Sequence, residues 1–131
     1  MTSGRTVGAA MTANPISIIE TASLAEAAKI LDSRRITGLP VVNAGGTLVG
    51  VLSQTDLVRV RANQHLNENW PGLPVGQIMT KPALTIHATA SLEEATSKMA
   101  EGRVHRLVVI DEMSNPIGII STSDLVRSWL R

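Results

Sequence analysis

The sequence predicts a mixed α/β (α+β) protein, a tandem pair of β-α-β-β-α units packed with pseudo-two-fold symmetry. The main observation is an internal repeat. Residues 7–60 recur as residues 75–128, 68 positions later, with 20 of the 54 paired residues identical and no insertion or deletion. In each copy, short β-branched runs alternate with stretches whose apolar residues have helical spacing. We therefore expect a tail at 1–6, a first domain at 7–60, a connection at 61–74 and a second domain at 75–131.

Each copy opens with a short strand that leads into a capped helix. In the first copy, the β-branched run Ile16–Ile19 is followed by Ser23 and Glu26, which have the spacing of a capping box. The apolar residues behind this cap predict an amphipathic helix of about eleven residues. Ser91 and Glu94 repeat the pattern in the second copy.

A β-hairpin and a second helix complete each copy. In the first copy, apolar runs at 39–42 and 48–52 flank the Gly-rich segment 43–47, which is typical of a hairpin turn. The second copy has matching runs at 106–110 and 117–120. We expect the second helix to begin near Asp56 and its counterpart to begin near Asp124.

Composition limits the classes of function. The 131 residues include no Phe, Tyr or Cys, and 12 basic residues balance 11 acidic ones. The two copies are therefore expected to share an aliphatic core without disulfides or thiolate metal sites. No nucleic-acid partner is expected, because the chain has no basic excess and only two Trp residues that could stack on bases. The absence of a signal-like segment at 1–15 and of any run of about 18 apolar residues predicts a cytoplasmic protein without membrane insertion.

The most informative motif is a polar turn that occurs in both copies, at Ser53–Asp56 and at Ser121–Asp124. Each turn follows an apolar strand and opens a helix. One interpretation is structural, because a Ser at the N-cap and an Asp three residues later stabilise a helix end. The other interpretation is a ligand site. Free N–H groups at a helix start suit a phosphate, and a carboxylate has two oxygens that can accept from ribose hydroxyls.

Two further features favour the ligand interpretation of these turns. A cap needs one hydroxyl, yet Thr55 and Ser123 supply a second one in each copy. Gly50 and Gly118 stand in the preceding strands, where a missing side chain would let a ligand approach the backbone.

The two copies differ just before the first strand of the hairpin. His105-Arg106 occupies these positions in the second copy, and Thr37-Gly38 in the first. Either His105 and Arg106 are solvated residues at a strand start, or Arg106 gives charge-assisted hydrogen bonds to a phosphate with His105 beside it. His65 and His87 have no partners at metal-ligand spacing, so no metal site is expected.

This ordered set of motifs closely resembles the CBS domain, named after cystathionine β-synthase. The resemblance rests on Gly50–Asp56 and Gly118–Asp124, on the Met-Thr pairs at 11–12 and 79–80, and on the runs 36–42 and 104–110. Two copies over residues 7–129 resemble the tandem pair called a Bateman module. The second copy is similar to a repeat of the gamma subunit of AMP-activated protein kinase.

The resemblance implies a regulatory ligand of the adenosine type, namely AMP, ADP, ATP or S-adenosylmethionine, held in a cleft between the copies. By matched position, Asp56 and Asp124 would bind ribose hydroxyls, and Ile16 and Leu84 would face adenine. The segments that contain Thr12 and Thr80 would border the base. Positions near the phosphates are implied for Thr37, Gly38, His105 and Arg106. The remaining candidates would lie near ribose or phosphate: Ser53, Thr55, Ser121, Thr122 and Ser123. Because only the second copy has an Arg at this position, the two phosphate sites are expected to be unequal.

The resemblance also implies a homodimer and a regulated protein partner of unknown identity. The last helix carries Leu125, Val126, Trp129 and Leu130, an apolar set that one chain would leave partly uncovered. A second class of function stays open, in which the chain is a ligand-independent interaction or dimerisation scaffold and the polar turns are only helix caps. An enzyme is not expected, because no nucleophile–base pair can be assembled. The sequence therefore predicts neither catalytic residues nor a catalytic cofactor.

Overall fold

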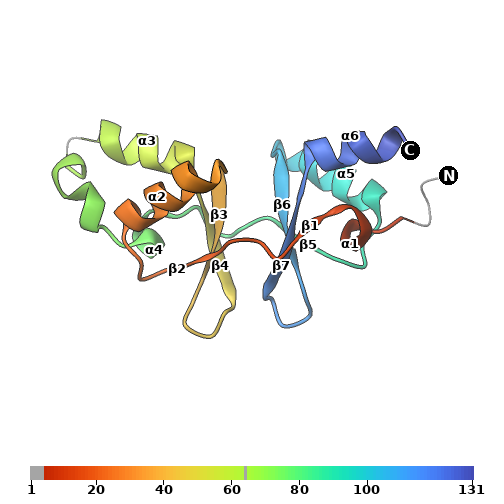
Figure 1. Ribbon diagram of the computed structural model, residues 1–131, viewed down its shortest axis with the longest axis horizontal. Helices are drawn as coiled ribbons and strands as arrows, with labels where there is room; N and C mark the ends of the chain where they lie inside the picture. Colours follow the sequence, from red (N-terminus) through yellow and green to blue (C-terminus); the bar gives the residue numbers. More distant parts are fainter. Residues whose placement is uncertain (1–4, 64) are drawn as a thin grey trace. The chain divides into compact units, whose positions relative to one another are not determined.

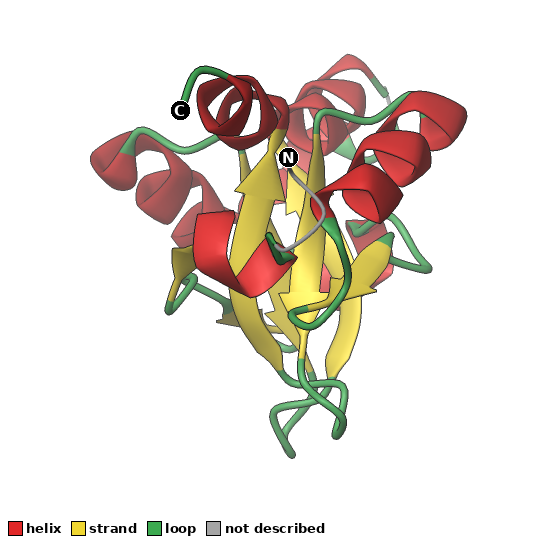
Figure 2. Ribbon diagram, turned by 90° about the vertical axis from the view of Figure 1, so that its right-hand side faces the viewer, coloured by secondary structure: helices red, strands yellow, loops and turns green. Residues whose placement is uncertain are grey.

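The computed structural model describes residues 5–63 and 65–131, and the chain folds into two compact units. The first unit is Ile16–Ala83, and the second unit combines the N-terminal segment up to Pro15 with Leu84–Arg131. Among the described residues, the strands form two sheets, one in each unit, and helices pack beside them (Figures 1 and 2). The α/β class predicted from the sequence is confirmed.

The first unit has the predicted β-α-β-β-α order. Its elements are β2 (Ile18–Ile19), α2 (Leu24–Arg34), β3 (Gly38–Val42), β4 (Leu48–Ser53), α3 (Gln54–Ala62), the 3-10 helix η1 (Asn67–Gly72) and α4 (Val75–Ile78). Strand β3 lies between β2, to which it is parallel, and β4, to which it is antiparallel. The stretch predicted as a connection thus contains the end of α3 and the 3-10 helix.

The second unit repeats this arrangement. Its elements are α1 (Val7–Ala10), β1 (Thr12–Ala13), β5 (Thr85–His87), α5 (Leu92–Gly102), β6 (Arg106–Ile110), β7 (Pro116–Ser121) and α6 (Thr122–Trp129). The sheet order is β1-β7-β6-β5, with β5 parallel to β6 and the other pairs antiparallel. Helices α3 and α6 begin two residues earlier than predicted, because Ser53 and Ser121 are their N-caps.

The compact units do not share the boundaries of the sequence repeats, because each unit takes a short segment from the other repeat. Helix α1 and strand β1 open the first repeat, yet Thr12 of β1 pairs with Ile119 of β7 in the second unit. Helix α4 opens the second repeat, yet the following Thr80 pairs with Val51 of β4 in the first unit. The repeat pattern did not reveal this exchange, because an internal repeat shows which positions are equivalent and carries no information on which segments are in contact.

Each unit has its own aliphatic core. The first core contains Leu24, Leu39 and Leu52, and the second contains Ile86, Leu107 and Ile120. The expectation of a single shared core is therefore wrong. The exchanged helices explain how each small unit closes its core, because Val75 of α4 and Val7 of α1 are 0% exposed within the first and second clusters.

The first strand of the first unit is shorter than predicted, because of Pro40. In the second unit, Val108 N–H donates to Leu84 O at 3.1 Å, and β5 begins at the next residue. Pro40 occupies the equivalent position in β3 and has no N–H to donate. Strand β2 consequently starts at Ile18, and Ile16 lies outside it.

Candidate ligand-binding site

The two polar turns are the N-terminal caps of α3 and α6, and we call them the first Asp turn (Ser53–Asp56) and the second Asp turn (Ser121–Asp124). The Ser53 N–H and hydroxyl donate to Asp56 Oδ2 at 2.8 and 3.1 Å, and the hydroxyl accepts from the Asp56 N–H at 3.2 Å. Ser121 and Asp124 make the same three bonds at 2.8, 2.9 and 3.3 Å. The structural interpretation of the turns is confirmed.

Capping uses only one oxygen of each carboxylate. In both turns Oδ2 accepts both bonds from the serine, so Oδ1 takes no part in the cap. An ionised carboxylate has about four lone-pair sites, which is enough for a cap and a further hydrogen bond. The capping role and a ligand-binding role are therefore compatible.

The Oδ1 atoms of the two turns have different partners. Asp56 Oδ1 accepts from the Thr80 hydroxyl at 3.1 Å, and Arg59 Nη1 lies 3.8 Å away. Asp124 Oδ1 instead accepts from Arg127 Nη1 at 3.1 Å. In the described part of the chain, no hydrogen bond joins Asp124 to Thr12, the counterpart of Thr80. Both carboxylates are mostly buried, with side chains 6% and 11% exposed.

Sequence reasoning missed the arginines of these contacts. Arg59 and Arg127 follow the two Asp residues at a spacing of three, which places them on the same helix face. The identical Asp-Leu-Val-Arg segment in both copies was the signal that could have found them. The exchange of segments also changes the grouping of the threonines. Thr80 belongs to the site of the first unit, and Thr12 to that of the second.

The sheet register brings residues 37–38 and 105–106 to the Asp turns. Gly38 pairs with Ser53 across β3 and β4, and Arg106 pairs with Ser121 across β6 and β7. Directly paired residues project from the same face of a sheet, so the exposed Arg106 side chain lies beside the cap of α6. The carbonyls before these positions, Thr37 O and His105 O, each accept a backbone bond at 2.9 Å from the first residue of α3 or α6.

The residues predicted to face adenine lie one strand further along each sheet. The parallel register of β2 and β3, continued by two residues, brings Ile16 level with Leu39. The register of β5 and β6 likewise brings Leu84 level with Leu107. Two strand spacings, about 10 Å, therefore separate these positions from the caps. Ile16 is half-buried against the first core, whereas Leu84 is exposed.

The space beside Gly50 and Gly118 is filled by the exchanged segments. A Cβ on Gly50 would lie 2.6 Å from Met79 Sδ and 2.9 Å from Thr80 O. A Cβ on Gly118 would meet Met11 Sδ and lie 3.0 Å from Thr12 O. The interpretation that these glycines admit a ligand is therefore wrong. They let the Met-Thr segments cross the strand and, in the first unit, bring Thr80 to Asp56.

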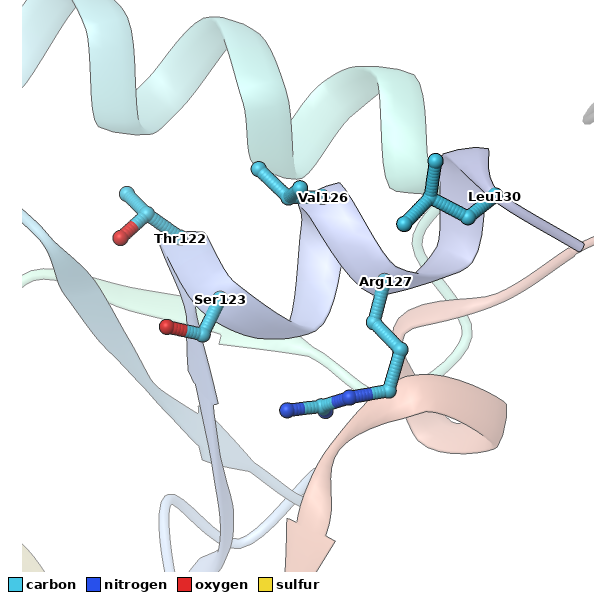
Figure 3. Close-up of a pocket in the computed structure, with 5 residues that line it drawn as sticks. All are labelled: Thr122, Ser123, Val126, Arg127 and Leu130. Atoms are coloured by element: carbon cyan, nitrogen blue, oxygen red, sulfur yellow. The ribbon is translucent and has the colours of Figure 1, made fainter.

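An open hollow adjoins the second Asp turn on the outer surface of α6. Its volume is about 400 Å³, and it is lined by Thr122, Ser123, Val126, Arg127 and Leu130. Figure 3 shows Thr122, Val126 and Leu130 along one side of the helix and Ser123 and Arg127 along the neighbouring side. The same surface thus offers two hydroxyls, a guanidinium and an apolar strip.

The structure assembles the candidate residues into two sets, one in each unit. The first unit holds Ile16, Thr37, Gly38, Ser53, Thr55, Asp56 and Thr80, and the second unit holds Thr12, Leu84, His105, Arg106, Ser121, Thr122, Ser123 and Asp124. Within the described ranges, no group of three or more His, Cys, Asp or Glu side chains could hold a metal ion. None of the described helices has the length and apolar character needed to cross a membrane.

Two β-α-β-β-α units with matching Asp turns define a protein of the tandem CBS type. The family model of the CBS domain matches residues 7–63 and again 75–131. The chain therefore belongs to the CBS domain family, as the sequence motifs predicted.

Curated relatives contain this pair as part of longer chains. The chain is 32% identical over 117 residues to the gamma-3 subunit of 5'-AMP-activated protein kinase from Bos taurus, covering 85% of this chain and 23% of the relative. It is 34% identical over 123 residues to a homoserine O-acetyltransferase from Methanocorpusculum labreanum, covering 94% and 24%. The chain thus spans about a quarter of the length of these relatives.

Solved structures of similar size have the same fold. The structure of CBSX2 in complex with AMP has a TM-score of 0.86, is 35% identical, and is matched over 97% of both chains. A CBS domain pair in complex with 5'-methylthioadenosine and S-adenosyl-L-methionine has a TM-score of 0.82, is 27% identical, and is matched over 95% of both chains.

Proposed function

We propose that the chain is a regulatory module that binds an adenosine-type ligand, AMP, ADP, ATP or S-adenosylmethionine, at its Asp turns and modulates a partner protein. The observation that carries this proposal is that the two oxygens of each carboxylate have different roles. Oδ2 caps the helix, and Oδ1, which lies outside the cap, can accept from a ligand hydroxyl. Two similar CBS pairs whose structures contain AMP or S-adenosyl-L-methionine support the ligand class.

In this proposal, each set of candidate residues has a consistent division of roles. Asp56 and Asp124 accept from ribose hydroxyls through Oδ1. The segments at Ile16 and Leu84 face adenine from the strand two positions along the sheet. The second hydroxyls, Thr55 and Ser123, are exposed near the helix start, where they can meet ribose or phosphate.

The phosphate sites are proposed to be unequal. Arg106 pairs with Ser121 at the second Asp turn, whereas Gly38 pairs with Ser53 at the first. A guanidinium gives charge-assisted, often bidentate bonds to phosphate, and a glycine offers only its backbone. The second turn is therefore the one expected to prefer nucleotides over nucleosides.

Titration calorimetry of the purified chain with AMP, ADP, ATP and S-adenosylmethionine tests the proposal. At least one ligand should bind, and Asp56→Asn or Asp124→Asn should each remove one site. An Asn side chain can keep the cap through its single oxygen while placing an NH₂ group where Oδ1 was. No heat and no thermal shift with any of the four at millimolar concentration would refute adenosine-type binding.

The alternative is an interaction scaffold, which the exposed apolar surface of α6 favours. Val126, Trp129 and Leu130 are 48%, 56% and 83% exposed. Their spacing of three and four residues places them on one helix face, and a contiguous exposed apolar patch is typical of an interaction site. We propose a homodimer through this face. A monomeric mass in solution at tens of micromolar, roughly the range in which a stable interface persists, would refute the dimer. A partner affinity unchanged by the double replacement of Asp56 and Asp124 with Asn would favour the scaffold over the sensor.

The remaining expectations also belong to this proposal. The module is proposed to act in the cytoplasm through another protein, without catalytic residues or a catalytic cofactor of its own. Assay of a purified partner's activity with and without the chain and its ligand would identify the sign of regulation. Regulation requires that the ligand bind the two states of the module with different affinity.

A further inference from the structure

The second Asp turn already holds a cation on the atom that a ribose would need. Arg127 Nη1 donates to Asp124 Oδ1 at 3.1 Å, while Oδ2 is committed to the cap. A ribose hydroxyl that approaches this carboxylate must therefore share or replace the guanidinium. The first turn differs, because Arg59 lies 3.8 Å from Asp56 Oδ1 and that oxygen accepts from the neutral Thr80 hydroxyl.

Arg127 is also placed to accept a new partner when it leaves Asp124. Its side chain is 59% exposed and lines the hollow together with Thr122 and Ser123. A guanidinium has five N–H donors, and the bond to Asp124 uses one of them. An anionic group beside the turn would thus find donors that a neutral ligand cannot use (Figure 3).

From this geometry we propose that Arg127 is a specificity-determining residue that makes the second Asp turn select phosphorylated over unphosphorylated adenosine ligands. This inference rests on the proposed function. A nucleoside competes with the guanidinium for Oδ1 and has no anionic group that the displaced guanidinium could bind. A nucleotide releases the same guanidinium but supplies a phosphate that it can bind. Arg127 therefore raises the ratio of nucleotide to nucleoside affinity in two ways, because it weakens binding of the nucleoside and strengthens binding of the nucleotide.

The size of the effect follows from the exposure of Arg127, whose side chain is 59% exposed although Asp124 is mostly buried. An ion pair whose cation is solvated contributes little, so removing the competitor should raise adenosine affinity only about twofold. Loss of charge-assisted donors to a phosphate should lower AMP affinity about fivefold. Replacing Arg127 with Gln should therefore reduce the AMP-to-adenosine affinity ratio about tenfold.

The test uses calorimetry with AMP and with adenosine in an Asp56→Asn background, so that only the second turn binds. Arg127→Gln should lower the affinity ratio about tenfold, with adenosine binding more tightly, and Arg127→Lys should retain part of the ratio because it keeps the charge. The matched control, Arg59→Gln in an Asp124→Asn background, should change the ratio at the first turn by less than about twofold, since no hydrogen bond joins Arg59 to Asp56.

The possible failures are distinguishable. If the parent chain binds neither AMP nor adenosine, this inference is overturned, and the proposed function is overturned with it only if ADP, ATP and S-adenosylmethionine also fail to bind. If the parent chain binds, Asp124→Asn abolishes one site, and Arg127→Gln shifts both affinities equally or leaves the ratio unchanged, only the inference is overturned. A thermal unfolding midpoint is measured for each variant, and Arg127→Gln should leave it nearly unchanged because the side chain is exposed.

Discussion

The two Asp turns have the same cap but different surroundings. Ser and Asp make three equivalent hydrogen bonds in each turn. Around this constant core, the first unit has Thr80 on Oδ1 and Gly38 beside the cap, and the second unit has Arg127 and Arg106. The groups that hold the helix start thus match between the units, while the groups that would meet a phosphate differ.

This difference separates the two roles of the Asp turn, which are to cap the helix and to present Oδ1 to a partner. The cap is local, because it depends only on residues three apart in sequence. The Oδ1 contact of the first unit is not local, since Thr80 is 24 residues from Asp56. The cap can therefore be read from the motif alone, whereas the ligand side of the carboxylate depends on the segment that crosses over it.

The largest expected effect concerns the two places where a Met-Thr segment crosses a strand, Met11-Thr12 at Gly118 and Met79-Thr80 at Gly50. Gly118→Ala would put a methyl group 3.0 Å from Thr12 O, and Gly50→Ala would put one 2.9 Å from Thr80 O. Each should destabilise the protein by about 2–3 kcal/mol in denaturant unfolding, because a backbone carbonyl cannot move aside cheaply. Adding Met11→Ala to Gly118→Ala removes the sulfur contact and not the carbonyl contact, so rescue should be partial. Full rescue would mean that the crossing backbone is free to shift.

The next effect separates the cap from the ligand contact. Asp124→Asn and Asp56→Asn should each weaken binding of an adenosine-type ligand at its own turn about thirtyfold, because a hydrogen bond to a charged acceptor is lost. A site weakened by this factor no longer contributes to a titration at the ligand concentrations that saturate the other turn. Stability should fall by less than about 1 kcal/mol, because the Asn oxygen keeps the cap and only the charge at the helix start is lost. Asp56→Asn should be the milder change, since Thr80 can accept from the new NH₂ group. Equal losses of stability and of binding would contradict this separation.

Much of the fold could be predicted because its determinants are local. Ser23 and Ser91 accept from the N–H of Glu26 and Glu94, which is the serine half of the predicted capping boxes, and α2 and α5 each have eleven residues. The hairpins and the capped second helices follow from short motifs in the same way. The repeat doubled this information, because each pattern was seen twice.

The rest could not be predicted because it depends on contacts between distant segments. The exchange of α1 and α4 depends on the burial of Val7 and Val75, each in the core of the unit formed mainly by the other repeat. A repeat pattern shows that these two residues are equivalent, but it does not show which core each one enters. The shortened β2 depends on one missing N–H in Pro40 of the adjacent strand. Among the candidate site residues, the sheet register brings residues 37–38 and 105–106 beside the turns. The bond from Arg127 to Asp124 Oδ1 forms only once α6 is folded.

Removal of the capping hydroxyl should have a smaller effect, and a different one in each unit. Ser53→Ala should cost about 1.5 kcal/mol and Ser121→Ala about 1 kcal/mol in denaturant unfolding. The first value is larger because Asp56 is 5% exposed and depends more on its internal donors. Asp124 is more accessible to water and keeps Arg127. Exposed Ser33→Ala is a control and should be nearly neutral. A larger loss of stability from Ser121→Ala than from Ser53→Ala would contradict the expectation that the cap matters more in the first unit.

A still smaller effect concerns the strand next to the adenine position. Pro40→Val would supply the N–H that Val108 supplies in the second unit, and it should bond to Ile16 O as Val108 does to Leu84 O. The new bond, worth about 1 kcal/mol, is offset by the greater freedom of the unfolded chain, so net stability should barely change. Hydrogen exchange should then reveal a protected amide at position 40, comparable with that of Val108. Rapid exchange there would show that β2 is short for a reason other than Pro40.

The smallest expected effect distinguishes the two hairpin turns by pH. Asp111 Oδ1 accepts from the N–H groups of Met113 and Asn115 at 2.9 Å each, and Asn43 Oδ1 accepts from Gly45 and Thr47 at 3.0 and 3.1 Å. The backbone N–H of Asn115 is the main reason that the pKa of Asp111 lies below its ordinary value. A lowered pKa stabilises the folded turn above the ordinary pKa, and this stabilisation is lost as pH falls below about 4. The amide resonances of Met113 and Asn115 should therefore shift in that range, those of Gly45 and Thr47 should not, and Asp111→Asn should abolish the shift. A common midpoint at both turns would trace the change to acid unfolding of the whole chain.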